Sequence, residues 1–115
     1  MDSEEVAFLL LLNQYRSDNG LNTLSISTNL TRAASWHVYD MGTQNYFGHT
    51  NIVGQGPQDR ATGCGYPYPV GENLAAGTDR DTARETFDAL RASPSHNSNM
   101  LRQGYVQVGI ARYYA

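Results

Sequence analysis

Two histidines and one glutamate are the residues whose types and spacing could do chemistry together. Glu72 stands between Gly71 and Asn73, and His49 and His96 flank it at similar distances along the chain. Two neutral imidazoles and a carboxylate form a plausible zinc site with water in an open position. Zinc lowers the pKa of bound water and can support hydrolysis. No self-contained motif such as His-x-x-x-His is present, so the spacing by itself leaves metal uptake and hydrolysis open.

Each of these three residues also has a structural interpretation. His49 could be an exposed loop histidine. His96 follows Ser-Pro and could cap the start of a helix. Glu72 could accept hydrogen bonds from backbone amides of its own glycine-rich loop. The residues alone do not decide between these roles and a shared site.

A nucleophilic site is a competing interpretation, because Ser93 and Ser95 lie near His96 and Glu72 could orient its imidazole. However, the chain has no Gly-x-Ser-x-Gly motif, and the two serines flank Pro94. The residue before proline avoids helical geometry, so we interpret this stretch as a helix boundary.

Tyrosines offer a different class of function, a binding surface. Several of the eight, among them Tyr46, Tyr66 and Tyr68, fall in a segment rich in glycine and proline. Tyrosine presents an apolar ring with a polar tip, which suits contact with a ligand or partner. Ordinary packing under long loops is the more frequent explanation for such residues.

Length and composition predict one folded domain over residues 1–115. Hydrophobic residues make up 40% and charged residues 17% of the chain, and the net charge is −3. All eight positive side chains are arginines and are scattered along the sequence, so we predict no nucleic-acid partner. Cys64 is the only cysteine; no internal disulfide can form, and we expect a packed small residue.

The apolar run of residues 6–12 is too short to span a membrane, so no transmembrane segment is predicted. Because this run is apolar on nearly every side, we expect its helix to be largely buried. Capping boxes at Asp2 and Thr82 indicate helix starts, and Pro57 suits a first helical position. Alternation of apolar residues near the end of the chain indicates a strand. Helices are predicted over residues 3–18, 28–42, 57–62, 80–92 and 97–101, and a strand over residues 105–114.

His37 falls on an apolar face of the second predicted helix. We interpret it as a core or rim histidine with one hydrogen bond rather than a ligand. Gly109 and Ala111 make one face of the final strand small, which would let a helix approach closely. Helices followed by loops, a helix and a strand indicate an α+β fold.

Several stretches taken together resemble the CAP superfamily, which comprises cysteine-rich secretory proteins, antigen 5 and pathogenesis-related 1 proteins. The similarity is to its bacterial, disulfide-free branch and covers essentially the whole chain, with the motifs in the family's order. These motifs are Leu12-Asn13-Gln14-Tyr15-Arg16, Ala34 to Met41, Phe47-Gly48-His49-Thr50, Asp59-Arg60, Gly71-Glu72-Asn73-Leu74-Ala75, Ser93-Pro94-Ser95-His96 and Val108-Gly109-Ile110.

The resemblance implies a three-layer α/β/α sandwich with a small, mainly antiparallel sheet, in a protein that is secreted or held at the cell envelope. The family's cleft carries two histidines and one or two glutamates, which in some members bind a divalent metal such as zinc. By motif, these residues match His49, Glu72 and His96 here. Family members are associated with sterol or lipid binding and with cell-surface interaction, and no single reaction is shared.

Three departures from the family pattern stand out. A second glutamate would fall near Ser93, so the acidic part of the cluster is incomplete. The eukaryotic cysteines and the Gly-His-Tyr-Thr-Gln signature are absent. The sequence also stops at Ala115, before a closing aromatic strand that many members carry, so we expect either a trimmed domain or a sheet with one strand fewer.

The resulting prediction is a secreted CAP-domain binding or interaction module rather than an enzyme. Its His49, Glu72 and His96 cleft would take up zinc or another divalent cation. A metal-dependent hydrolase acting on peptide or ester bonds and a lipid- or sterol-binding protein are the alternatives. The expected partner is an unidentified ligand or surface, either lipid or peptide.

Overall fold

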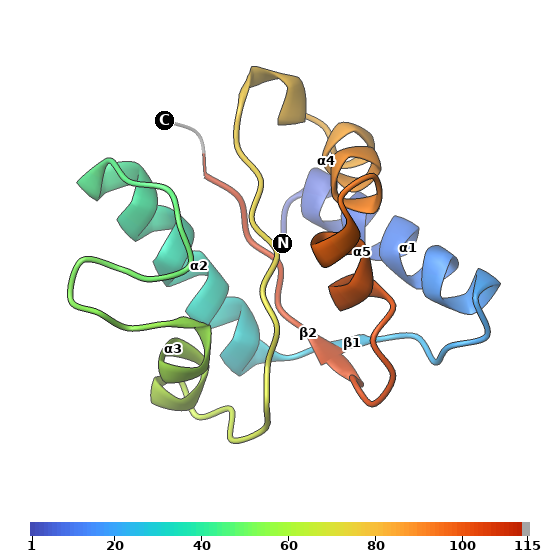
Figure 1. The fold of residues 1–115 in the computed structure, drawn as a ribbon, viewed down its shortest axis with the longest axis horizontal. Helices are drawn as coiled ribbons and strands as arrows, with labels where there is room; N and C mark the ends of the chain where they lie inside the picture. Colours follow the sequence, from blue (N-terminus) through green and yellow to red (C-terminus); the bar gives the residue numbers. More distant parts are fainter. Residues whose placement is uncertain (114–115) are drawn as a thin grey trace. The chain divides into compact units, whose positions relative to one another are not determined.

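The computed structural model describes residues 1–113 and divides the chain into two compact units (Figure 1). Unit 1 comprises Met1–Ser25 and Ala75–Val106, and unit 2 comprises Ile26–Leu74 and the segment that starts at Gln107. Helices and a small sheet occur together, which confirms the α+β class. In chain order the elements are α1 (Ser3–Asp18), β1 (Ser25–Ile26), α2 (Thr28–Gln44), α3 (Pro57–Gly63), the 3-10 helix η1 (Thr78–Arg80), α4 (Ala83–Arg91), α5 (Pro94–Met100) and β2 (Gln107–Val108).

The strands β1 and β2 pair in a two-stranded sheet. The amide of Ser25 donates to the carbonyl of Val106 at 3.0 Å, and the amide of Ser27 donates to that of Val108 at 2.9 Å. Both partners advance by two residues, so the described strands run parallel, whereas a mainly antiparallel sheet was predicted. The strand predicted over residues 105–114 is also shorter than expected, and its residue 114 lies outside the described part of the chain.

In unit 1, α1 begins where the capping box predicts. Glu5 donates its backbone amide to the Asp2 carboxylate at 2.8 Å, and the Glu5 carboxylate accepts from the Asp2 amide at 2.7 Å. The helix packs on α4 through Phe87, whose ring lies edge-on to those of Phe8 and Tyr15, with centroids 6.2 and 5.5 Å away. This aromatic contact forms the centre of the unit 1 core.

The expectation that α1 is largely buried is wrong. Only Leu12 and Arg16 are buried, while Val6 is exposed and Leu10 is 67% exposed. A helix turns through a full circle every 3.6 residues, so an apolar run places side chains all round. The packing against α4 covers one stripe of that surface, so most of the run is only half-buried and Val6 and Leu10 stay exposed.

Arg16 joins distant segments of unit 1 from a fully buried position. Its guanidinium donates to backbone carbonyl oxygens at the end of α1 and around the end of α5. Burial lowers the pKa of Arg16, yet these oxygens satisfy its donors. The acceptors are the carbonyls of Asn22 at 2.8 Å, Met100 at 2.9 Å, Arg102 at 3.0 Å and Tyr105 at 3.4 Å.

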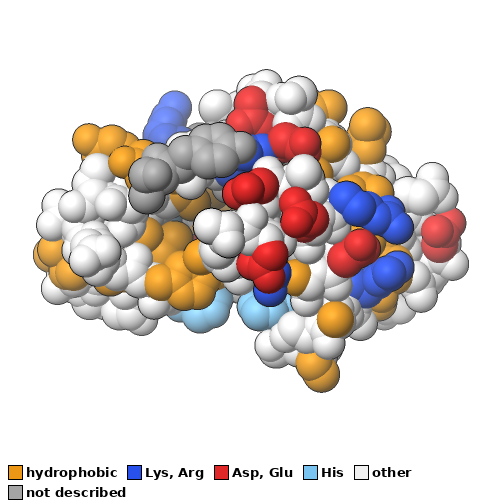
Figure 2. Space-filling model, turned by 90° about the horizontal axis from the view of Figure 1, so that it is seen from above, with side chains coloured by type: hydrophobic (Ala, Val, Ile, Leu, Met, Phe, Trp, Pro, Cys, Tyr) orange, Lys and Arg blue, Asp and Glu red, His pale blue; other side chains and the backbone are white. Residues whose placement is uncertain are grey.

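Exposed arginines of unit 1 lie beside acidic side chains instead. On α4, Asp88 pairs with Arg84 at 3.4 Å and with Arg91 at 3.7 Å. Figure 2 shows blue and red side chains interleaved in this way. Exposed pairs of this kind contribute little to stability. None of the helices described over residues 1–113 is long and apolar enough to cross a bilayer.

In unit 2, α2 is capped by the hydroxyl of Ser27, which accepts from the Leu30 amide at 3.1 Å. It runs two residues beyond the predicted end and stops at Asn45, whose φ of 58° is left-handed. Pro57 opens α3 as predicted, and Cys64 follows it as a half-buried free thiol. These two helices pack together, and they supply His37 and Arg60 to unit 2.

Gly109 confirms the expected close approach of the last segment to a helix. A Cβ atom added there would lie 2.2 Å from the backbone carbon of Leu30 and 2.4 Å from the amide nitrogen of Thr31. Contacts this short with backbone cannot be relieved by moving a side chain. Only glycine therefore allows the segment after β2 to lie directly on α2.

Replacing Arg16 with methionine should destabilise the protein by about 3 kcal/mol or more, because several buried carbonyls lose their donor. The measurement is urea unfolding followed by circular dichroism. Arg84→Met is the matched control, since Arg84 makes only an exposed pair on α4, and it should change stability by less than about 0.5 kcal/mol. Equal effects of the two substitutions would contradict the role given to Arg16.

Candidate functional site

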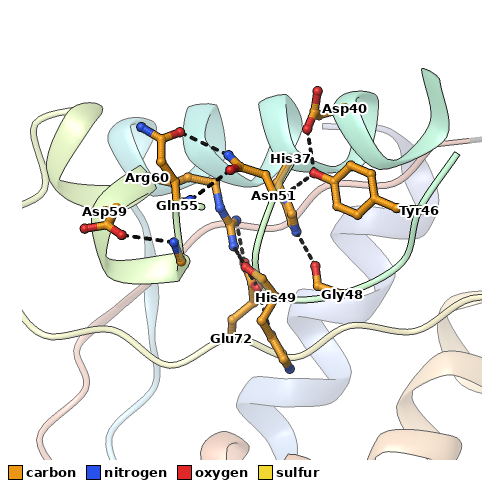
Figure 3. Close-up of polar contacts among 11 residues, drawn as sticks. His37, Asp40, Tyr46, Gly48, His49, Asn51, Gln55, Asp59, Arg60 and Glu72 are labelled. Atoms are coloured by element: carbon orange, nitrogen blue, oxygen red, sulfur yellow. Dashed lines mark hydrogen bonds and ion pairs between the residues drawn. The ribbon is translucent and has the colours of Figure 1, made fainter. Parts of the chain in front are cut away.

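The candidate site lies in unit 2 and is centred on an ion pair between Arg60 and Glu72 (Figure 3). Arg60 donates from Nη1 to Glu72 Oε2 at 2.8 Å and from Nη2 to Oε1 at 3.1 Å. Glu72 Oε1 also lies 2.9 Å from Nδ1 of His49. The carboxylate therefore holds a guanidinium on one side and an imidazole on the other.

The helix α3 places Arg60 at this point. Gly56 donates its amide to the Asp59 carboxylate at 3.0 Å, which fixes the start of the helix one residue before Pro57. The side chain of Arg60 is buried, and its Nη2 also donates to the backbone carbonyl of His49. One guanidinium thus holds both the backbone and, through Glu72, the ring of His49.

The buried His37 of α2 holds the residue before His49. Its Nε2 donates to the carbonyl of Gly48 at 2.8 Å, which confirms the prediction of a core histidine that makes a hydrogen bond. Tyr46 lies 3.5 Å from the other ring nitrogen and donates its hydroxyl to Asp40. Burial, followed by the hydrogen bond and negative charge of Asp40, raises the pKa of Tyr46 to about 12.

Asn51 orders the loop that follows His49. It is buried, and its side-chain oxygen accepts from the amides of Val53 at 3.2 Å and Gln55 at 2.9 Å. Its side-chain nitrogen donates to Gln55 Oε1 at 3.0 Å. The backbone on both sides of His49 is therefore held by buried polar side chains, which limits the directions in which the ring can point.

Glu72 is ionised in this setting. Burial by itself would raise its pKa, but the hydrogen bonds from Arg60 and His49 and the charge of Arg60 outweigh burial, and the pKa of Glu72 lies below its ordinary value. A carboxylate held in this way keeps its charge at neutral pH. It is an effective hydrogen-bond acceptor and a weak general base.

The donor set of unit 2 fits a metal through His49 rather than through Glu72. Both oxygens of Glu72 accept from Arg60, whose positive charge would oppose a cation bound to the same oxygens. The His49 side chain is 52% exposed, and its second ring nitrogen points away from Glu72 (Figure 3). A carboxylate that orients a histidine by its other nitrogen is a common arrangement behind metal ligands.

Within the described residues of unit 2, no three His, Cys, Asp or Glu side chains gather as a metal site. The third predicted residue, His96, belongs to unit 1. It lies in α5, and its Nδ1 is 2.9 Å from the hydroxyl of Ser93, the N-cap of that helix. The helix boundary predicted around Pro94 is confirmed, while convergence of His49, Glu72 and His96 stays a prediction.

Arg60 is the main residue that sequence reasoning did not assign to the site. In the sequence it stood out only as part of the Asp59-Arg60 motif of the family resemblance. A usable signal existed, because a carboxylate that is buried in a glycine-rich loop needs a positive partner and every cation of this chain is an arginine. The positioning roles of His37 and Asn51 carry no comparable signal in the sequence.

This fold and site agree with comparisons to known proteins. The profile of the CAP, or cysteine-rich secretory protein, family matches residues 9–115. The chain therefore belongs to the CAP family. Among curated proteins, no significant match to the sequence is found.

Two solved structures share the fold. An extracellular protein containing an SCP domain from Bacillus anthracis superposes with a TM-score of 0.89 at 24% identity, over 96% of this chain. An outer surface protein from Borrelia burgdorferi superposes with a TM-score of 0.83 at 22% identity, over 95% of this chain and 81% of its own. The chain spans 37% of the length of the Bacillus protein. The likeness confirms the predicted α/β/α sandwich class.

Replacing Glu72 with glutamine should lower stability by about 3 kcal/mol at neutral pH, because the buried Arg60 loses its counter-charge. The folded-state pKa of Glu72 is below the unfolded value, so the ion pair stabilises the fold fully above about pH 5. Its contribution disappears as the pH falls below about 4.3 and through the lower folded pKa. Urea unfolding at several pH values should show the difference between the two proteins shrinking in acid.

Asp79→Asn is the control for this experiment, since Asp79 pairs with Arg80 at an exposed position. It should change stability by less than about 0.5 kcal/mol at neutral pH. A Glu72→Gln effect that is the same at every pH would show that charge is not what the carboxylate contributes.

Proposed function

We propose that this chain is a secreted CAP-domain binding module whose His49 binds a divalent cation such as zinc. The supporting observation is the His49 ring itself, which Glu72 holds by Nδ1 while its second nitrogen is open to ligands. In this proposal Glu72 and Arg60 orient the ring. His96 is the proposed second imidazole, and direct ligation by Glu72 would require Arg60 to release one of its oxygens.

A binding role is favoured over catalysis by the state of the carboxylate. A general base works best with a pKa near the operating pH, and the pKa of Glu72 is shifted the other way. Metal, when bound, would supply Lewis acidity and an activated water. The residues of this site contribute orientation of His49 and a fixed local charge.

Location and partner follow from the same proposal. The two structural neighbours are described as an extracellular and an outer surface protein, which supports secretion or attachment to the cell envelope for this chain as well. The partner would be a peptide or a lipid at that surface. A cation bound at His49 would offer it a coordination position.

The proposal predicts that zinc binds to the purified chain and raises its unfolding temperature. At about a hundredfold excess over Kd the stabilisation should be about 2.7 kcal/mol. His49→Ala should weaken zinc binding at least roughly tenfold in calorimetry, because it removes a ligand. Thr50→Ala, the adjacent exposed residue, is the control and should bind as the parent does.

His96→Ala separates two parts of the proposal. Loss of zinc binding in both histidine variants would support convergence of the two imidazoles on one ion. Loss in His49→Ala alone would reject that convergence while leaving a cation at His49. Zinc binding that survives His49→Ala would reject the site altogether.

A metal-dependent hydrolase is the alternative, and the carboxylate–imidazole pair of Glu72 and His49 is the observation that favours it. Peptide and ester libraries should be assayed with zinc added and then removed by a chelator. We expect no turnover under either condition. Zinc-dependent cleavage that is lost in both His49→Ala and His96→Ala would replace the binding module with the enzyme.

Lipid binding is the remaining alternative and has a separate basis in unit 1. A pocket of about 470 Å³ lies between α1 and the start of α4, lined by Ala7, Leu10, Leu11 and Ala83 together with Glu4, Thr82 and Arg84. Alkyl side chains beside two charged ones would suit a short acyl chain with a polar end.

A further inference from the structure

A second pocket lies in unit 2, and uncharged polar groups and two tyrosine rings line it. Its volume is about 390 Å³, within the range of small-molecule sites. It lies among the start of α2, the turn after α3 and the strand β2, and it shares no residue with the Arg60–Glu72 site. Its lining includes Thr28, Asn29, Gly65, Tyr66, Tyr68 and Gln107.

The two tyrosine rings that line this pocket support each other. The rings of Tyr66 and Tyr68 pack edge to face, with centroids 5.5 Å apart and planes at 79°. Tyr66 is buried and supports its neighbour, while Tyr68 is 63% exposed. An aromatic ring held at one edge and open on its surface is suited to stacking against a flat partner.

The turn that carries these rings is anchored to both helices of unit 2. The side-chain amide of Asn29 donates to the carbonyl of Gly65 at 3.2 Å, and Gly65 has a left-handed φ of +92°. Gln58 of α3 donates to the carbonyl of Tyr68 at 3.0 Å and accepts from the amide of Val70 at 3.1 Å. Such anchoring reduces the entropy lost when a ligand binds.

The polar groups of the pocket define the chemistry of its ligand. No lining residue carries a formal charge. Among residues 1–113, the side chains of Thr28, Tyr68 and Gln107 have no hydrogen-bond partner, so a hydroxyl, a phenol and an amide are available to a ligand. A charged ligand would find no counter-charge among these residues. A purely apolar ligand would leave these polar groups unsatisfied.

We propose that this pocket binds a neutral saccharide. A sugar ring has an apolar face of C–H groups that can stack on Tyr68, and its rim of hydroxyl groups can exchange hydrogen bonds with Thr28 and Gln107. A proline-rich peptide, the other ligand that favours tyrosine rings, needs an extended aromatic groove. Here Tyr66 and Tyr68 are the aromatic residues of the lining, and residues of α2 and β2 make up other parts of it.

The experiment uses the described chain with two probes, the β-linked oligosaccharides chitotetraose and cellotetraose. Binding is followed by calorimetry and by amide chemical-shift changes in NMR spectra. We expect saturable binding of at least one probe with a Kd of about 1 mM, and shifts that map to the residues around Tyr68. Tyr68→Ala should weaken binding roughly tenfold, as expected for loss of one stacking ring.

Three further variants make the result specific. Tyr39→Ala is the matched control, because Tyr39 is a tyrosine of similar exposure, 60%, that does not line the pocket, and its affinity should be unchanged. Gln107→Ala should weaken binding, since it removes an amide partner of the sugar hydroxyls. His49→Ala should leave saccharide binding intact, so failure here and failure of the cation site are separable.

Absence of shifts with either saccharide at about 10 mM would overturn the proposal. Equal losses of saccharide affinity in Tyr68→Ala and Tyr39→Ala would also overturn it, because they would indicate that saccharides stack on exposed tyrosines in general. A proline-rich decapeptide serves as the comparison probe, and its binding in place of the saccharides would reassign the pocket to a peptide.

Discussion

The ion pair between Arg60 and Glu72 is the constraint on which unit 2 depends. It joins the helix α3 to two segments without regular structure. These are the glycine-rich segment, held through the carboxylate, and the loop at His49, held through the carbonyl that Arg60 also bonds. A buried ion pair stabilises a fold only when its donors and acceptors are well placed. Removing one partner leaves a buried charge without its counter-charge and lowers stability strongly. A single pair therefore fixes both the path of the loops and the direction of the one exposed imidazole.

This constraint also shapes the chemistry available at the site. A glutamate beside a histidine suggests two ligands for one metal, but here the carboxylate is already occupied by a guanidinium and carries a lowered pKa. Its effect on His49 is orientation. Arg16 plays the corresponding structural role in unit 1, where it has no carboxylate and is satisfied by carbonyl groups alone. In both units a buried arginine joins segments that are distant in the sequence.

Local signals were sufficient for most helices. The capping boxes at Asp2 and Thr82 satisfy amides at a helix start and Pro57 removes one, so their effect is decided within a few residues. The place of His37 on the apolar face of α2 was predicted correctly for the same reason, because helical spacing is local. The burial of α1 and the direction and length of the last strand were misjudged. Each depends on which segment from elsewhere packs alongside, and periodicity does not name that segment.

The sequence by itself determined the family, the starts of α1, α2 and α3 and the three residues worth testing as a site, because these rest on residue types in order along the chain. Only the tertiary structure decided that Glu72 meets Arg60, that Tyr68 stands exposed beside Tyr66, and that Gly109 lies against the backbone of α2. The physical reason is that the free energy of placing a charge, an aromatic ring or a glycine depends on the atoms that surround it in the fold. For Glu72 and Gly109 those neighbours lie many residues away, and the chain reaches them only by folding.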